Sequence, residues 1–474
     1  MSKAFAISIV TTLREGGFQA YLAGGCVRDL LLGREPADYD VATDATPQQV
    51  MQVFPETYAV GAQFGVVLVP LPESERVHRL KTSDPGDSGS DATDGQAVAL
   101  GHHHKTCVEV ATFRRDISYS DGRHPDEVRF SRDAREDVQR RDFTINGLLL
   151  DPLKNELLDF VGGRRDLEAR IIRAIGNPEL RFSEDKLRML RGVRFAARFE
   201  YSIEAETFAT MQRLAPQIRQ VSRERVRDEL TRMLIERHAR RAFELLDGSG
   251  LLKEILPEIS AMKGVEQPPE FHPEGDVFVH TLLLLEKLPH PCPVTLAWGA
   301  LLHDVGKPPT FRRAHDRIRF DDHVNVGVRM AQEVCRRLRF SNDDTQQILA
   351  LVDNHMRFGD VQRMKPSTFK KFIRLAHFDQ HLELHRLDCE SSHRSLRMYD
   401  YTREQMANLP PESVRPKPLL GGDDLIAQGY EPGPLFKQIL STIEDAQLDG
   451  KLRSKAEAMS FVTRHFPQRQ RLSS

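Results

Sequence analysis

The sequence has little cysteine, no long apolar run and no excess of charge of one sign. Its five scattered cysteines form neither a CxxC pair nor an even framework, which excludes a disulfide scaffold and a zinc ribbon and is typical of reduced thiols. No apolar stretch approaches the ~18 residues of a membrane span, so we expect a cytoplasmic protein with no membrane partner. The 67 basic and 69 acidic side chains nearly cancel, so any nucleic-acid binding must be confined to a local patch.

The length of 474 residues predicts two to four domains, because single cores stop growing at roughly 250 to 300 residues. Short β-like runs mix with helical stretches in the N-terminal third, and helical periodicity dominates afterwards. The N-terminal mixture predicts an α/β or α+β unit, and the chain as a whole is predicted to be α+β. The predicted parts are a head at 1–158, an all-α neck at 159–262, a helical body at 263–409 and a helical tail at 410–474.

Two segments of the head stand out by composition. The N-terminal apolar run is interrupted by Arg14 and Glu15, which predicts an amphipathic first helix rather than a signal peptide. Residues 72–107 are rich in turn formers and contain a histidine triplet at 102–104. Their low hydrophobicity predicts a solvated loop inserted between two strands.

A strand-like run leads through Gly24 and Gly25 into a predicted helix that carries Arg28. Two glycines at such a turn let the backbone approach a triphosphate, while the helix N-terminus and the guanidinium supply positive potential. Taken alone, the glycine pair is equally compatible with an ordinary turn.

Asp38 and Asp40 follow, two residues apart. On a strand both carboxylates would point to one face and could hold the same hard cations. Two Mg²⁺ ions held in this way would activate an attacking hydroxyl and neutralise a leaving pyrophosphate. A surface Asp-x-Asp at a strand edge is the alternative. Glu109, on a predicted neighbouring strand, is a candidate third carboxylate that could equally face solvent.

Two basic clusters come later in the chain. Arg140 and Arg141 stand just ahead of an apolar element, in a position suited to phosphate or ribose contacts. Beyond them, the stretch from Glu184 predicts a helix in which Asp185 and Arg188, three residues apart, share a face.

Four motifs, Gly-Gly-x-Val-Arg-Asp, Asp-x-Asp, Arg-Arg-Asp-Phe-Thr-Ile-Asn and Glu-Asp-x-x-Arg, occur in this order between about residues 21 and 256. Together they resemble the bacterial class II tRNA nucleotidyltransferase and poly(A) polymerase family. The resemblance implies a polymerase-β-like nucleotidyltransferase head with a mixed sheet and helices, in which the catalytic residues Asp38 and Asp40 bind Mg²⁺. It also implies the residues that contact the incoming nucleotide: Gly25, Arg28, Arg141, Asp185, Arg188, Arg191 and Arg194.

Two loops bear on this resemblance. The insertion at 72–107 departs from the family, in which a short turn joins the two strands. The segment 116–128, with Tyr119, Asp121 and Arg123, resembles the family's flexible loop, which is linked to switching between bases.

In the family, Asp185 and Arg188 read the base. Cytosine and adenine both present an exocyclic amine beside a ring-nitrogen acceptor, so an aspartate that accepts and an arginine that donates select C and A together. Uracil and guanine present the opposite pattern, and each buried mispaired group costs about 1 to 3 kcal/mol. A plain surface ion pair between the two side chains is the alternative.

Basic residues concentrate between Arg181 and Arg241. Interspersed carboxylates indicate that part of this stretch is a solvated, ion-paired face. The rest is predicted to be a phosphate track for an A-form stem of tRNA. Ser222 is the predicted N-cap of a helix within this stretch.

A second constellation lies in the helical half. His280, the pair His303-Asp304, His323 and Asp388 resemble the HD metal-dependent phosphohydrolase superfamily over about residues 271–394. The resemblance implies that His280, His303, Asp304 and Asp388 bind a divalent transition metal, Ni²⁺, Co²⁺ or Mn²⁺, which activates water. Asp388 is the least specific of the four, and His355 is a spare candidate. A scaffold without hydrolytic activity is the alternative.

These motifs predict an enzyme that adds C, C and A to the 3′ end of tRNA from CTP and ATP without a template. Within the same family, the alternatives are a CC-adding or A-adding partial enzyme and a poly(A) polymerase. From other classes, the alternatives are an HD phosphohydrolase with a nucleotide-sensing head and a structural RNA-binding protein. The oligomeric state is not predicted.

Overall fold

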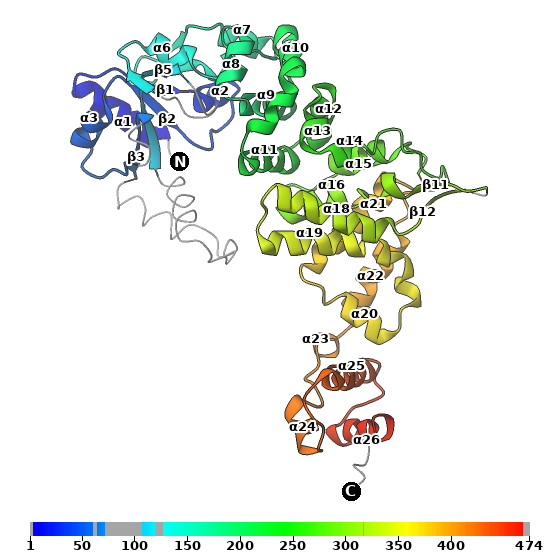
Figure 1. Cartoon of the computed structure of the whole chain (residues 1–474). Helices are drawn as coiled ribbons and strands as arrows, with labels where there is room; N and C mark the ends of the chain where they lie inside the picture. The colour runs from blue at the N-terminus through cyan, green and yellow to red at the C-terminus, as the bar shows by residue number, and fades with distance from the viewer. Residues whose placement is uncertain are drawn as a thin grey trace. The chain divides into compact units, whose positions relative to one another are not determined.

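A computed structural model describes residues 3–59, 64–71, 107–118, 127–270, 272–315 and 317–467. The chain divides into two compact units, Met1–Ile255 and Leu256–Ser474, and each is described by itself (Figure 1). The finer division into four parts stays a prediction. Within the described ranges, no helix combines the length and the apolar character needed to cross a membrane.

Six strands of the first unit form a mixed sheet in the order β3-β4-β2-β1-β7-β8. Neighbours pair antiparallel except β2 and β4, which are parallel. The strands are β1(Ala20–Ala23), β2(Asp40–Thr43), β3(Val66–Pro70), β4(Cys107–Thr112), β7(Leu148–Asp151) and β8(Glu156–Asp159). The predicted mixed sheet is thereby confirmed.

The segment 72–107 connects two neighbouring strands, because β3 ends at Pro70 and β4 begins at Cys107. All of the segment except Cys107 lies outside the described residues. A separate hairpin is formed by β5(Arg114–Ser118) and β6(Glu127–Phe130). The predicted flexible-loop residues Tyr119, Asp121 and Arg123 fall between its strands and also lie outside the described residues.

Helices pack on the sheet of the first unit (Figure 1). They are α1(Lys3–Glu15), α2(Gly25–Leu31), α3(Pro47–Val53), α6(Ala134–Gln139) and the 3₁₀ helix η2(Thr144–Asn146). The amphipathic first helix is confirmed, because Ile9 and Leu13 of α1 are buried in one core with Leu22, Val41 and Val108 of the sheet. This core fixes β1, β2 and β4, of which β2 begins at the candidate carboxylate Asp40 and β4 carries the candidate carboxylate Glu109.

The rest of the first unit is mainly helical. Its helices are α7(Gly163–Glu168), α8(Pro178–Glu184), α9(Leu187–Phe199), α10(Ala205–Leu214), η3(Ala215–Gln220), α11(Arg223–Ile235), α12(Ala239–Gly248) and α13(Leu251–Ile255). The expectation of an all-α neck is wrong in one detail, since β9(Ile171–Ile172) and β10(Ser202–Ile203) form a short parallel pair. Two residues per strand are too few for the alternation that reveals a strand in a sequence.

The second unit is also helical, with one small hairpin of β11(Phe311–Arg313) and β12(Ile318–Phe320) that the sequence did not predict. The helices up to residue 408 are α14(Pro257–Ser260), α15(Val277–Glu286), α16(Val294–Leu302), α17(Lys307–Thr310), α18(His323–Arg337), α19(Asn342–Asn354), η4(His355–Arg363), α20(Pro366–Phe372), α21(Phe378–Ser391) and α22(Arg397–Asn408). The helices beyond it are α23(Pro411–Val414), α24(Gly422–Ala427), α25(Pro434–Leu448) and α26(Lys455–His465). The segment 420–462 has a hydrophobic cluster of its own.

Candidate functional site

The first unit contains a strongly basic cavity of about 520 Å³. Nine arginines and three aspartates line it, a balance that suits a triphosphate. Eight of the nine residues predicted for this site are among them: Gly25, Arg28, Asp40, Arg141, Asp185, Arg188, Arg191 and Arg194. The fold therefore brings together segments from β1 to α11, and the roles of the individual residues stay predictions.

The Gly24-Gly25 turn belongs to this cavity and requires glycine at its first position. Gly24 has a φ of 73°, which disfavours side chains. A Cβ atom at Gly24 would also lie 2.9 Å from Nη1 of Arg141. Arg28, in the helix that follows, donates to Oδ1 of Asn146 at 2.6 Å and lies over the ring of Phe199. These contacts hold its guanidinium at the cavity wall.

The carboxylates lie where β2 meets β4. Asp40 and Glu109 are paired residues of these parallel strands and line one small cavity together. Burial, followed by the negative charge of Glu109, raises the pKa of Asp40 to about 7. Carboxylates crowded in this way are the oxygen ligands that hard divalent cations prefer. Their arrangement supports Glu109 as the third carboxylate, which stays a prediction.

Asp38 differs from its expected placement. It precedes β2, which begins at Asp40, and its side chain is exposed. The expectation that both aspartates alternate along one strand is therefore wrong. Asp38 is close enough for its charge to contribute to the raised pKa of Asp40.

The Arg-Arg-Asp motif is a network of buried charges. Arg140 and Arg141 both donate to the carboxylate of Asp137 on α6. Asp142 accepts from Arg191 at 2.9 Å and from Asn146 at 3.0 Å. Burial alone would raise the pKa of Asp142, but the charge of Arg191 and these hydrogen bonds lower it to about 2. The network orients the arginines toward the cavity.

Asp185 and Arg188 are not on one continuous helix, which corrects the expectation. Asp185 ends α8, and its Oδ1 accepts from the backbone N–H of Leu187 at the start of α9. Its Oδ2 accepts from Arg225 of α11 at 2.7 Å. Arg188 pairs instead with Glu184 at 2.6 Å. The two proposed base readers therefore do not pair with each other, which excludes the alternative of a plain surface ion pair.

Sequence reasoning missed Arg225, although it belongs to the basic stretch. Its partner lies 40 residues away, and no spacing rule connects a helix end with a distant helix. Arg194, like Arg28, is buried, and it pairs with Glu229 at 2.7 Å. Ser222 does precede α11 as predicted, but its side chain makes no capping hydrogen bond.

Much of the basic stretch is ion-paired, as the alternative interpretation expected. Further pairs join Arg181 to Glu184, Arg198 to Glu236, Arg213 to Glu179, Arg219 to Glu254, Arg227 to Asp228 and Arg240 to Glu244. Arginines in such pairs remain able to exchange a surface carboxylate for a phosphate, because exposed pairs contribute only ~0–1 kcal/mol.

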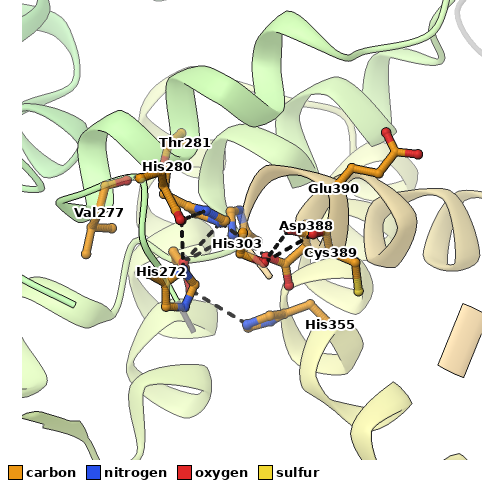
Figure 2. Close-up of polar contacts among 12 residues, drawn as sticks. His272, Val277, His280, Thr281, His303, His355, Asp388, Cys389 and Glu390 are labelled. Atoms are coloured by element: carbon orange, nitrogen blue, oxygen red, sulfur yellow. Dashed lines mark hydrogen bonds and ion pairs between the residues drawn. The ribbon is translucent and has the colours of Figure 1, made fainter. Parts of the chain in front are cut away.

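The second unit contains a histidine-rich cavity of about 470 Å³. The side chains of His280, His303, His355 and Asp388 point toward one another in Figure 2. His280, His303 and Asp304 have ligand atoms within 4.8 Å of one another. Asp388 lies 3.2 Å from Nε2 of His280. All four predicted ligands thus meet, from α15, the end of α16 and α21.

The imidazoles are oriented as metal ligands. Nδ1 of His280 contacts Glu274 at 2.8 Å, and Nδ1 of His303 contacts the carbonyl of Ala300 at 2.8 Å. Their buried Nε2 atoms each face a carboxylate oxygen at 3.2 Å, of Asp388 and of Asp304, without the geometry of a hydrogen bond. Histidines that bind a metal through one ring nitrogen usually have the other ring nitrogen held by a carboxylate or a backbone carbonyl, as Nδ1 is here. Burial lowers the pKa of His280, but Asp388 and Glu274 outweigh it and raise the pKa to about 9.

Three family models match consecutive parts of the chain. The family model described as "Poly A polymerase head domain" matches residues 20–83 and 78–173. That described as "Probable RNA and SrmB- binding site of polymerase A" matches 200–263, and the HD domain model matches 277–388.

Curated relatives match the same regions. A CCA-adding enzyme of Geobacillus sp. (strain WCH70) is 30% identical over 454 residues, covering 95% of this chain and 94% of the relative. One of Bacillus pumilus (strain SAFR-032) is 38% identical over 64% of this chain and 63% of the relative.

A solved structure gives the same result. The crystal structure of the Bacillus stearothermophilus CCA-adding enzyme in complex with CTP matches with a TM-score of 0.69 and 26% identity, over 97% of this chain and 98% of that one. The family models, the near full-length relative and this structure agree, and the chain belongs to the CCA-adding enzyme family of nucleotidyltransferases.

Proposed function

We propose that this chain adds C, C and A to the 3′ end of tRNA from CTP and ATP without a nucleic-acid template. One observation carries the proposal: a single basic cavity combines a buried carboxylate site with the candidate base reader Asp185. The relatives named above are CCA-adding enzymes, and one was solved with CTP. We place the activity in the cytoplasm, which agrees with five cysteines that form no disulfide.

The carboxylates fit the divalent metal dependence of nucleotidyltransferases, and we propose Mg²⁺ as the ion. Asp38 and Asp40, with Glu109 beside them, would hold it, because Asp40 and Glu109 are paired across β2 and β4 and line one small cavity together. Bound Mg²⁺ would lower the barrier by stabilising the attacking and leaving oxygens. In the reaction the 3′ hydroxyl loses its proton to water and its oxygen bonds to the α-phosphorus. The bond between the α-phosphorus and the oxygen that bridges to the β-phosphate breaks, and pyrophosphate leaves with that electron pair.

The arginines of this chain position the nucleotide. Arg28, Arg141 and Arg191 would contact its phosphates, where preorganised guanidiniums lower the cost of binding a polyanion. Asp185 and Arg188 would take the place of a template at the base. Separate partners hold these two side chains, so both present fixed hydrogen-bonding groups before a nucleotide arrives.

Product length is the decisive test. The full chain is incubated with tRNA lacking its 3′ end and each labelled nucleoside triphosphate, which separates CCA, CC, A and poly(A) addition. We expect three added nucleotides with CTP and ATP together. Asp40→Ala should abolish incorporation, and incorporation that survives this change would overturn the site.

Base selection has its own test. Asp185→Ala and Arg188→Ala should relax the preference for CTP and ATP over UTP and GTP by roughly 10- to 100-fold, since each buried mispaired group costs about 1 to 3 kcal/mol. Unchanged discrimination would contradict the base-reading role.

A second activity is favoured by the buried Nε2 atoms of the histidine-rich cavity. We propose that His280, His303, Asp304 and Asp388 hold Ni²⁺, Co²⁺ or Mn²⁺ there, and that the unit hydrolyses phosphate esters. Bound metal would supply an activated water. The test is hydrolysis of a 2′,3′-cyclic phosphate with each added ion. No bound metal and no hydrolysis would leave only a scaffold role.

A further inference from the structure

Two phenylalanines of α9 lie among the arginines of the basic cavity. Phe195 lines the cavity, and Phe199 lies one helical turn further along α9. The two rings are stacked with their centroids 6.2 Å apart, and both residues are buried. Residues three and four positions apart share a helix face, so Phe195 interrupts a basic stripe formed with Arg191 and Arg198. An apolar ring thus occupies a place where the pattern of the helix would put another charge.

Each ring lies under three guanidinium groups, at the distances of cation–π contacts, which reach about 6 Å from the ring centroid. The distances from Cζ to the centroid of Phe195 are 5.4 Å for Arg28, 5.3 Å for Arg191 and 4.5 Å for Arg194. The distances to the centroid of Phe199 are 4.6 Å for Arg28, 5.5 Å for Arg34 and 5.5 Å for Arg198. Significant contacts of this kind occur on average about once per 70 to 80 residues, so their concentration on two rings indicates a specific arrangement.

The rings hold the arginines in a way that carboxylates cannot. A ring attracts the face of a guanidinium and uses none of its five N–H donors, whereas a carboxylate accepts from one or two of them. One edge of Arg191 is already held by Asp142 at 2.9 Å, and one edge of Arg194 by Glu229 at 2.7 Å. A guanidinium held at its face by a ring and at one edge by a carboxylate has a fixed orientation, and its remaining N–H groups stay available to a phosphate.

The rings also reduce the repulsion between crowded charges. Burial lowers the pKa of Arg28, its partner Asp29 opposes this, and the charge of Arg198 lowers it again, so the two guanidiniums repel each other. Phe199 lies under both of them. Its ring face carries negative potential that attracts each guanidinium. A carboxylate in the same place would neutralise part of the charge of the cavity and compete with a phosphate, and a ring does neither.

We propose that Phe195 and Phe199 are positioning residues of the nucleotide site, whose ring faces hold Arg28, Arg191 and Arg194 in the orientation that receives a triphosphate. The proposal rests on the nucleotidyltransferase function proposed above and deepens it, because it explains how the charge of the cavity is arranged before a nucleotide arrives. The rings act through the arginines and not on the reacting atoms. Their loss should therefore weaken phosphate binding equally in the ground state and the transition state, which raises KM and leaves kcat unchanged.

Fluorination of one ring tests the proposal on the full chain, because added fluorine removes negative potential from the ring face with little change of shape. Mono-, tri- and pentafluorophenylalanine are each incorporated in place of Phe195 or Phe199. We expect the Kd for inorganic triphosphate and the KM for CTP to rise stepwise, by roughly tenfold for the pentafluoro ring, at an unchanged kcat. Phe182 is the matched control. It is buried on α8 of the same unit, and no arginine in the described part of the chain lies over its ring, so its fluorination should leave both constants unchanged.

Constant values of Kd and KM across both series would overturn the proposal, and so would equal changes in the Phe182 series. Phe195→Leu gives a second measurement, because it replaces the ring face with an aliphatic side chain. It should raise the Kd for inorganic triphosphate as far as the pentafluoro ring does, and an unchanged Kd would contradict the proposal.

The addition of nucleotides to tRNA lacking its 3′ end is measured in the same samples. Stepwise weakening of triphosphate binding in a chain that adds no nucleotide would refute the proposed function and leave the positioning role standing. A constant Kd in a chain that adds C, C and A would do the reverse.

Discussion

The buried ion pair between Arg194 and Glu229 provides the sharpest test of how the first unit is held together. Nε of Arg194 lies 2.7 Å from Oε2 of Glu229, and the side chains are 5% and 6% exposed. Replacing one partner of a buried pair leaves the other charge buried, at a cost of about 3 to 5 kcal/mol. The longer contact between Nη1 of Arg194 and Oε1 of Glu236, at 3.5 Å, should offset only part of this cost. Glu229→Gln removes the charge with almost no change of volume, so this cost should dominate.

The expected effect on thermal stability follows from the size of the unit. For 150 to 250 residues, each kcal/mol shifts the melting temperature by roughly 2 to 4 °C. Glu229→Gln should therefore lower the melting temperature of the first unit, which spans Met1–Ile255, by about 6 to 20 °C in calorimetry. The control is Glu179→Gln. Its partner Arg213 lies at 2.9 Å, but the two side chains are 54% and 56% exposed, so the shift should correspond to less than about 1 kcal/mol.

A double variant separates stability from nucleotide binding. Arg194→Met combined with Glu229→Met should recover most of the lost stability, because an apolar pair can replace a buried ion pair. If Arg194 also contacts the nucleotide, the stable double variant will still show a raised KM for CTP. Equal melting shifts for Glu229→Gln and the exposed control would refute the reasoning.

Three further changes have defined outcomes. Arg225→Gln removes the guanidinium that holds Oδ2 of Asp185. Discrimination against UTP and GTP should fall roughly tenfold, with little change in kcat for CTP. Steady-state kinetics with each nucleotide measures both. Gly306→Ala places a Cβ atom 2.0 Å from a backbone oxygen at the start of α18, so it should unfold or open the second unit. Calorimetry should then show the loss of the second unit's transition. The control Gly359→Ala adds a Cβ atom with no other atom within 4 Å and should leave the transition unchanged. Asp142→Asn should lower the free energy of unfolding by roughly 2 kcal/mol at pH 7. This figure follows from the lowered pKa of Asp142, at about 1.4 kcal/mol per pKa unit. A carboxyl group whose pKa is lowered by folding stabilises the fold fully only above its pKa in the unfolded chain. The difference in unfolding free energy between the wild type and Asp142→Asn should therefore shrink as pH falls from about 4 toward 2. Urea unfolding at several pH values measures it, and a constant difference would contradict the reasoning.

The order and spacing of the motifs predicted the mixed-sheet head and the helical remainder, which the structure confirms, and two sites whose residue roles stay predictions. Strand β1, the amphipathic helix α1 and the glycine turn depend on local patterns of apolar residues and on one left-handed backbone position. Such features are encoded over a few residues, so the sequence alone contains them. The short pairs β9-β10 and β11-β12 escaped prediction because two or three residues per strand carry no readable period.

Only the tertiary structure decided how the predicted side chains are used. It pairs Asp40 with Glu109 through strand register, separates Asp185 from Arg188 at a helix joint, and buries Arg194 against Glu229. It also assembles the histidines of the second unit around the two oxygens of Asp304. These relations join residues 35 or more positions apart in most cases, and which of them meet depends on packing rather than on spacing. The sequence by itself therefore determined the chemical groups, and the fold determined their partners.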